Sequence, residues 1–310
     1  VYENDNGILK NVTGAIAPEF EDFGMVNKVI TTDFNNDGWP DFIAVGEWTH
    51  IGIFQNNNGV FTDISTDSKL DEEKGWWFNV TETDVNNDGL KDYFIGNIGN
   101  NIKFKVSKQK PLRVYADDFD LNGTHDVVLS YKYNDVFVPA RGKECSTQQM
   151  PFISEKMPSF NEFANASLED IYGEKIGTAY QREANQFKSI LLLNKGNGQF
   201  SKIYLPHMVQ TMPVMDAAVM DVNKDGFEDL ILVGNIYNTE VETPRLDNPY
   251  GLILLSNGTD NYDVIGPETS GFYINGDAKS VEIIQNGEKT LILVGCNNGA
   301  TEAFEFKEAI

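Results

Sequence analysis

Hydrophobic and polar positions along the chain form short runs that predict strands. The clearest unit enters at residues 26–32, crosses an Asp-rich loop and returns at residues 42–48. Two further runs, residues 51–55 and 60–64, flank a turn of three Asn and one Gly. β-branched and aromatic runs of this length, separated by Asn and Gly, are typical of antiparallel strands joined by tight turns. The pattern predicts a four-stranded antiparallel sheet.

Similar units recur along the chain. They begin near Trp76, Leu112 and Val214, and a degenerate fifth unit without the Asp-rich loop covers residues 278–306. Recurring four-stranded units are typical of β-propellers, whose blades bury their faces against one another. We therefore predict an all-β fold, a β-propeller of four-stranded antiparallel blades with about five visible. A closed five-bladed ring and an incomplete larger ring both fit, and we expect the incomplete one.

Two segments depart from this repeat. Residues 1–13 resemble the outer half of a blade, which would either close the ring against the C-terminal strands or belong to a blade that begins upstream. Residues 146–186 carry helical patterning instead, with Ser159 and Ser167 as predicted N-caps. We predict one propeller over residues 1–310, as the C-terminal part of a longer protein, with a partly helical insertion at 146–186. The insertion is either a functional loop or a cap over one face.

The strongest signal is a loop motif, D-x-[DN]-x-[DN]-G-x-x-D, which occurs four times. Ca²⁺ takes six to eight oxygen ligands, and side chains at positions 1, 3, 5 and 9 with the carbonyl of position 7 could supply them. Glycine at position 6 permits the sharp turn. We predict up to four structural Ca²⁺ ions, with these ligands: Asp33, Asn35, Asp37, Trp39 and Asp41; Asp84, Asn86, Asp88, Leu90 and Asp92; Asp118, Asp120, Asn122, Thr124 and Asp126; Asp221, Asn223, Asp225, Phe227 and Asp229.

Two alternatives compete with this interpretation. An EF-hand loop begins in the same way but carries a bidentate Glu at position 12 and continues as a helix. Here position 12 is apolar in all four loops, and strand patterns follow them: Ala44, Ile95, Leu129 and Leu232. The other alternative is a set of metal-free Asx and Gly turns. Loop three is the most atypical, because Asn122 precedes its glycine where the other loops have Asp.

The net charge and the composition limit the classes of partner that the chain is expected to bind. The formal net charge of −23 disfavours nucleic acid and anionic membrane surfaces. No apolar run reaches the roughly 20 residues that span a bilayer, so direct membrane insertion is not expected. Two cysteines, Cys145 and Cys296, lie far apart in sequence and either pair or remain free thiols.

The loops, their flanking strands and the N-N-x-G-x-F turn resemble FG-GAP/VCBS repeats, the calcium-binding blades of integrin α-chain propellers. The finer pattern is similar to the C-terminal propeller of bacterial cartilage-acidic-protein-like proteins, often associated with ASPIC/UnbV segments. It includes Asp37-Gly38-Trp39-Pro40-Asp41, Gly75-Trp76-Trp77 and Gln148-Gln149-Met150-Pro151-Phe152. The resemblance implies an exported protein, extracellular or associated with the outer membrane at the cell surface.

These observations favour an extracellular interaction or scaffold module for a protein partner or a surface assembly. Common hydrolase and nucleotide-binding motifs are missing, and the three histidines are isolated in sequence, so we do not expect an enzyme: His50, His125 and His207. Carbohydrate binding, or less plausibly cleavage, is the alternative. Its candidate stacking and charged residues are Trp48, Trp76, Trp77, Arg141, Arg182 and Arg245.

Overall fold

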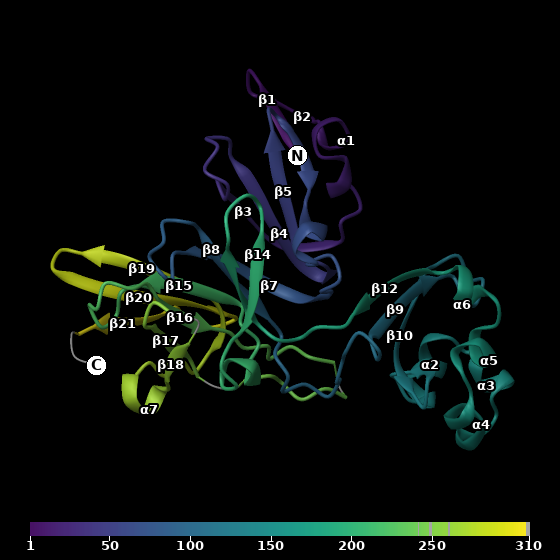
Figure 1. The fold of residues 1–310 in the computed structure, drawn as a ribbon. Helices are drawn as coiled ribbons and strands as arrows, with labels where there is room; N and C mark the ends of the chain where they lie inside the picture. Colours follow the sequence, from purple (N-terminus) through teal and green to yellow (C-terminus); the bar gives the residue numbers. More distant parts are fainter. Residues whose placement is uncertain (241, 248–249, 260, 308–310) are drawn as a thin grey trace. The chain divides into compact units, whose positions relative to one another are not determined.

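The structure, a computed structural model, describes residues 1–240, 242–247, 250–259 and 261–307 and confirms an all-β, propeller-like fold (Figure 1). The chain divides into two compact units. The blade unit comprises residues 1–103 and 187–310, and the inserted unit comprises residues 104–186. Within the described part of the chain, no helix is both long and apolar enough to cross a membrane.

The strands of the blade unit form four consecutive antiparallel groups, the blades, and pairing of β4 with β7 joins the first two blades into one eight-stranded sheet. The first blade is β3 (Met25–Thr32), β4 (Asp41–Thr49), β5 (Gly52–Asn57) and β6 (Val60–Asp63). The second is β7 (Gly75–Thr83), β8 (Asp92–Asn97), β13 (Ile190–Asn194) and β14 (Phe200–Tyr204). The third is β15 (Asp216–Met220), β16 (Asp229–Val233), β17 (Leu252–Ser256) and β18 (Tyr262–Ile265), and the fourth is β19 (Asp277–Asn286), β20 (Lys289–Asn297) and β21 (Glu302–Phe306).

The second blade is assembled from two distant parts of the sequence. Strand β13 pairs antiparallel with β8, with Ile190 opposite Ile95 and Leu192 opposite Tyr93. Residues 104–186 therefore enter the sequence between the second and third strands of one blade. This split explains why strand patterning resumes at residue 190, after the helical segment.

The inserted unit has its own sheet, in the order β11-β10-β9-β12. Its strands are β9 (Leu112–Asp117), β10 (Asp126–Tyr133), β11 (Val136–Pro139) and β12 (Tyr180–Ala184). The sequence pattern placed a propeller blade at Leu112, but these strands pair with one another, and the last strand adds beside the first. The helices are α2 (Lys143–Gln149), α3 (Phe152–Lys156), α4 (Phe160–Asn165), α5 (Leu168–Tyr172) and α6 (Lys175–Thr178).

Two of these helices begin where the sequence predicted. Ser159 and Ser167 each form a capping box, accepting a hydrogen bond from the backbone N–H three residues later. Helices α2 to α6 pack on the sheet around a buried core that includes Tyr115, Phe119 and Ile171. The inserted unit therefore has a core of its own, and burial of each such side chain stabilises it by about 1.5–3 kcal/mol.

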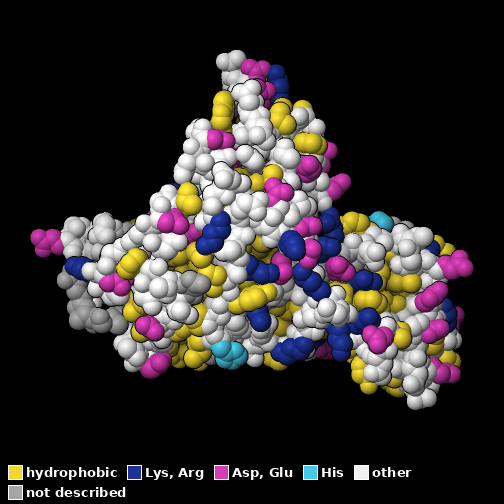
Figure 2. Space-filling model, viewed as in Figure 1, with side chains coloured by type: hydrophobic (Ala, Val, Ile, Leu, Met, Phe, Trp, Pro, Cys, Tyr) yellow, Lys and Arg dark blue, Asp and Glu magenta, His cyan; other side chains and the backbone are white. Residues whose placement is uncertain are grey.

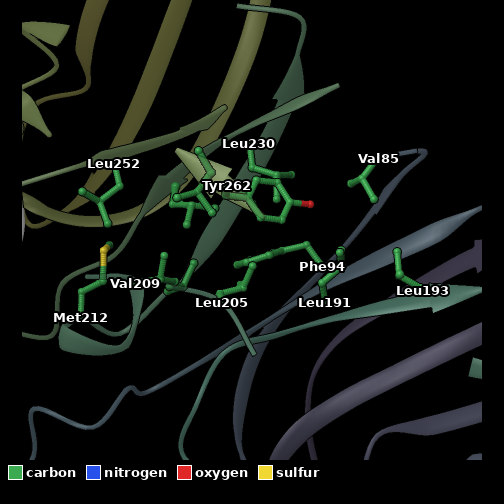
Figure 3. Packing of buried hydrophobic residues seen from close by; sticks show 14 residues of the cluster. Val85, Phe94, Leu191, Leu193, Leu205, Val209, Met212, Leu230, Leu252 and Tyr262 are labelled. Atoms are coloured by element: carbon green, nitrogen blue, oxygen red, sulfur yellow. The ribbon is translucent and has the colours of Figure 1, made fainter. Parts of the chain in front are cut away.

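Three apolar layers hold the blade unit together, one between each pair of neighbouring blades. Between the second and third blades, Phe94 and Leu191 face Leu230, Leu252 and Tyr262 (Figure 3). Strands buried on both faces read as continuous apolar runs, as Leu230 to Val233 do. The first strands β3, β7, β15 and β19 lie next to one another in that order.

A group of polar contacts centred on Lys28 and Asp216 joins all four of these first strands. Lys28 of β3 donates to Asp216 of β15 at 2.8 Å, and the other oxygen of Asp216 accepts the N–H of Val281 in β19 at 3.0 Å. Lys28 also donates to the Asn79 amide oxygen at 2.6 Å. This partly buried ion pair therefore fixes the relative positions of β3, β15 and β19 in addition to the apolar layers.

The outer segments complete the unit. The N-terminal strands β1 (Tyr2–Asp5) and β2 (Ile8–Asn11) pair with each other. Within the described residues, β19 to β21 also pair only among themselves, so residues 1–13 do not close the ring against the C-terminal strands. Short helices α1 (Thr13–Ile16) and α7 (Pro267–Ser270), and 3-10 turns at Pro18–Phe20, Ser65–Ser68 and Val209–Thr211, connect the strands.

Candidate metal centres

The four Asp-rich loops have the same backbone conformation. Loops one (33–41), two (84–92) and four (221–229) each join the first two strands of a blade, and loop three (118–126) joins β9 to β10. Position 4 has a positive φ in every loop, at Asn36, Asn87, Leu121 and Lys224. The position-6 glycines have φ between 82° and 90°, with open space where a Cβ would stand. Glycine is therefore required by backbone geometry and not by crowding.

Side-chain oxygens at positions 1, 3 and 5 organise each loop. In loop one, Asp33 accepts hydrogen bonds from the N–H groups of Asp37 and Gly38 at 3.1 and 2.9 Å. Asn35 accepts from Asp37 N–H at 3.0 Å, and Asp37 accepts from Trp39 N–H at 2.8 Å. Loops two, three and four repeat this set of contacts almost completely. Positions 1, 3 and 5 are thereby brought to the same side of each loop.

The position-9 aspartates are buried and have a second role that the motif alone did not reveal. Asp92 accepts the N–H of Val85 in its own loop at 3.3 Å and the N–H of Asn194 in β13 at 2.8 Å. Asp41 and Asp229 make the same pair of contacts, to Asn56 in β5 and to Ser256 in β17. Each carboxylate thus joins the loop to the third strand of its blade.

Loop three differs at this position. Asp126 accepts Phe119 N–H at 3.2 Å, but its other oxygen meets the side-chain amide of Gln149, at 3.4 Å, in place of a strand N–H. The register explains this difference, because β11 pairs with β10 only over Ser130–Tyr133 and does not reach Asp126. Gln149, the last residue of helix α2, supplies the contact instead.

The loops of neighbouring blades are also joined directly. The Asn194 amide donates to the Phe34 carbonyl in loop one at 2.8 Å, and the Ser256 hydroxyl donates to the Val85 carbonyl in loop two at 3.1 Å. Glu228 of loop four accepts Asp84 N–H at 2.7 Å, and Asn87 donates to the Gly226 carbonyl at 2.8 Å. Loops two and four therefore form one connected polar cluster.

Sequence reasoning missed these connecting residues. Asn56, Asn194 and Ser256 all stand at the end of a third strand, two or three residues before a glycine, and that shared position is the signal that could have revealed them. Glu228 carries no comparable pattern, because the other loops have Pro40, Lys91 and His125 at position 8.

Electrostatics show that the loops concentrate negative charge. The pKa of Asp41 is raised to about 6, chiefly by burial and to a smaller extent by the nearby charges of Asp37 and Asp33. Asp92 likewise has a pKa raised to about 6, first by burial and then by Asp88 and Asp84. The pKa of Asp229 and of Asp126 is raised in the same direction, again chiefly by burial. A cation beside these carboxylates would remove the repulsion.

Three observations fit a bound Ca²⁺. Ligand oxygens of Asp118, Asp120 and Asp126 lie within 4.8 Å of one another. Asp221 Oδ1 in loop four is buried and has no hydrogen-bond partner among the described residues. The donor set consists of carboxylate and amide oxygens, which hard cations prefer. Loop three, the most atypical in sequence, has the tightest acidic cluster, because Asp at its position 3 replaces the Asn of the other loops. The carbonyls of Trp39, Leu90, Thr124 and Phe227 stay predicted ligands.

Other candidate residues lie elsewhere. Trp77 is fully buried and donates to the Thr49 carbonyl, and Trp76 packs edge-on against Trp48 and near Phe187. The rings of these tryptophans therefore contribute mainly to packing within the blade unit, and less to a surface on which a sugar could stack. His50 contacts Asp63 at 2.9 Å, and Cys145 and Cys296 do not form a disulfide with each other.

The comparisons with known proteins agree with this geometry in one region. Residues 33–95 match the family model of an FG-GAP-like repeat. The matched segment runs from the first residue of loop one, through the first blade, to β8 beyond loop two. A search of curated proteins finds no match. FG-GAP repeats are typical of propeller-type protein-interaction modules and of extracellular proteins.

Proposed function

We propose that this chain is a calcium-stabilised interaction module that acts outside the cell, as a scaffold for a protein partner at a bacterial surface. The observation that carries the proposal is the connected cluster of loops two and four. A cation in loop two would be held in part by the Asp84 carboxylate, and the backbone N–H of the same residue donates to the Glu228 carboxylate of loop four. A cation in loop four would be held by Asp229, the residue next to Glu228. Each ion would therefore strengthen a contact between blades as well as a single turn.

The proposed extracellular location is argued from the chemistry of the predicted calcium sites. Exposed, acidic loops with mixed carboxylate and amide ligands suit the abundant calcium of extracellular fluids. The FG-GAP-like repeat at residues 33–95 supports the same location. Similarity to the propellers of bacterial cartilage-acidic-protein-like proteins supports attachment at the outer membrane. The proposal includes no catalytic step.

Calcium is expected to raise the melting temperature of the whole chain. A single site at 100 times its dissociation constant stabilises the folded state by about 2.7 kcal/mol. The four tryptophans all lie between residues 39 and 77, so their fluorescence reports unfolding of the blade unit. Melting curves recorded in calcium, in magnesium and in excess chelator measure the effect.

The matched control is Asp135→Asn, which removes an exposed acid outside the loops. This variant should respond to calcium like the unaltered chain, and Asp88→Asn in loop two should respond less. Equal melting temperatures in calcium and in chelator would show that the loops are metal-free turns.

If the chain is a calcium-dependent scaffold, a protein partner should bind to it only when calcium is present. We expect chemical cross-linking in the outer-membrane fraction of the source bacterium to join this chain to one reproducible protein when calcium is present. Chelator should abolish that cross-link, and Asp88→Asn should weaken it, while Asp135→Asn should leave it unchanged. Cross-links that are unaffected by chelator would contradict a calcium-dependent scaffold.

A further inference from the structure

The second strand of each blade uses its two faces in a fixed way. In the second blade, Tyr93 and Ile95 follow the loop at positions 10 and 12 and belong to the apolar layer shared with the first blade. In the third blade the same positions, Leu230 and Leu232, belong to the layer shared with the second blade. Position 11 of the second blade, Phe94, points the other way and packs toward the third blade. Positions 10 and 12 therefore mark a preceding face, which meets the blade before it, and position 11 marks a following face, which meets the blade after it.

The inserted unit has the same strand pattern, but only one face of its sheet is covered. Position 11 after loop three is Val128, which belongs to the core beneath the helices. Positions 10 and 12 are Val127, which is 54% exposed, and Leu129, which is half-buried. Helices α2 to α6 thus take the place of a following blade, and the preceding face of this sheet is open to solvent.

The open preceding face is apolar and rich in aromatic rings. Residues directly opposite one another in neighbouring strands share a face, so the register of the four strands identifies its members. Five of them are large apolar side chains that are at least 40% exposed: Val127, Tyr131, Tyr133, Val136 and Tyr180. An exposed apolar patch of this extent indicates an interaction surface.

The fourth blade carries a face of the complementary kind. Ile292 and Val294 of β20 belong to the layer shared with the third blade. Leu291 and Leu293 alternate with them and so lie on the following face of this blade. Ile284 of β19 stands opposite Leu291 and is 41% exposed. In the described residues, the following faces of the first three blades are buried in the apolar layers, whereas that of the fourth blade is exposed.

We propose that the open preceding face of the inserted unit packs on the following face of the fourth blade of a second copy of this chain. The contact repeats, between copies, the packing that already joins neighbouring blades three times within the blade unit. Two apolar sheet faces pack with their side chains interdigitated, as in a β-sandwich. A second copy is the occupant because the chain itself presents both halves of this contact. The inference does not depend on the proposed calcium sites.

Charge favours this arrangement over contact between two blade units. Residues 104–186 contain ten Lys and Arg and twelve Asp and Glu, a formal net charge of −2. The remaining residues contain 14 Lys and Arg and 35 Asp and Glu, a formal net charge of −21. Acidic side chains are scattered over the visible surface of the molecule (Figure 2). An inserted unit can therefore approach the blade unit of another copy with less repulsion than a second blade unit could.

The two faces differ, so the contact is head-to-tail and leaves one face of each kind free at the ends of a dimer. Such association continues beyond the dimer unless the rotation closes a ring. A four-stranded sheet of this size offers about 400 Å² of face, half of what each partner buries in a stable complex. We therefore expect weak association, with a dissociation constant of about 0.1 mM.

Sedimentation velocity of the whole chain tests the inference, at concentrations from about 10 µM to about 1 mM that bracket the expected dissociation constant. The average mass should rise with concentration and pass that of a dimer. Association should be stronger in about 0.5 M salt than at low salt, because salt screens the repulsion between copies of net charge −23.

Two variants identify the faces. Val127→Glu and Ile284→Glu should each sediment as a monomer over the whole range. An equimolar mixture of the two should form dimers and nothing larger, because each variant keeps one intact face and the two intact faces are complementary. Recovery in the mixture also shows that both variants are folded. The matched control is Val60→Glu, which adds the same charge at a 47% exposed position of the first blade and should associate like the unaltered chain.

Three results would overturn the inference. Monomers at every concentration and salt would leave the open face to a different protein. Association that Val127→Glu abolishes and Ile284→Glu does not would assign the face to symmetric pairing of two inserted units. Association that neither variant weakens would place the contact elsewhere on the chain.

Discussion

Replacing Asp92 by alanine is expected to lower the free energy of unfolding of the blade unit by about 5 kcal/mol in calcium and by about 2 kcal/mol without metal. Without metal, the substitution leaves the N–H groups of Val85 and Asn194 without acceptors, at a cost of about 1–3 kcal/mol each. Removing a buried carboxylate with a raised pKa returns part of that cost. In calcium, loss of the site adds about 3 kcal/mol.

Asp88→Ala is the matched variant, because it removes another predicted ligand of the same loop. Asp88 is exposed and accepts only contacts within its own loop. We therefore expect a change within about 0.5 kcal/mol without metal, and a loss of about 3 kcal/mol in calcium. Chemical unfolding followed by tryptophan fluorescence, in both buffers, gives the four values. Equal losses for both variants without metal would remove the assigned role of Asp92 between loop and strand.

The difference between these two residues shows what the sequence could and could not reveal. The motif presents both residues in the same way, as predicted metal ligands: Asp88 at position 5 and Asp92 at position 9. Position 9 also begins the second strand of its blade, so its carboxylate points into the interior and meets the third strand. In the second blade that strand starts at residue 190, almost a hundred positions away. No local pattern links Asp92 to Asn194, because residues 104–186 separate their two strands in the sequence.

The inserted unit shows the same limit in another form. Its strands carry the blade pattern, including the full Asp-rich loop, so periodicity alone predicts another blade at Leu112. Local features such as the caps at Ser159 and Ser167 were predictable, because each depends on three adjacent residues. Strand order was not predictable, because five helices separate β12 from the other strands of its sheet in the sequence. The open face of this sheet, with Val127 and Tyr180, likewise exists only because the helices pack on the other face.

Acidification is expected to stabilise the blade unit without metal and to destabilise it in calcium. Asp41 and Asp92 have folded-state pKa values of about 6, above the ordinary value of 3.8. For a carboxyl whose pKa is raised by folding, the folded state binds more protons than the unfolded state between these two values. Its contribution to stability is therefore complete below about pH 4 and is lost as the pH rises through 6. The loss is about 3 kcal/mol for each carboxyl.

Calcium reverses the sign, because the ion binds only ionised ligands and protons compete with it. Unfolding free energies from tryptophan fluorescence between pH 4.5 and 7, in buffer stripped of metal and in calcium, should therefore slope in opposite directions. Asp92→Asn should flatten the metal-free slope, since one of the two raised carboxyls is gone. Asp135→Asn, an exposed acid of the inserted unit, should leave it unchanged. Parallel slopes in the two buffers would mean that protons and calcium do not share these carboxylates, and the loops could not be the calcium sites.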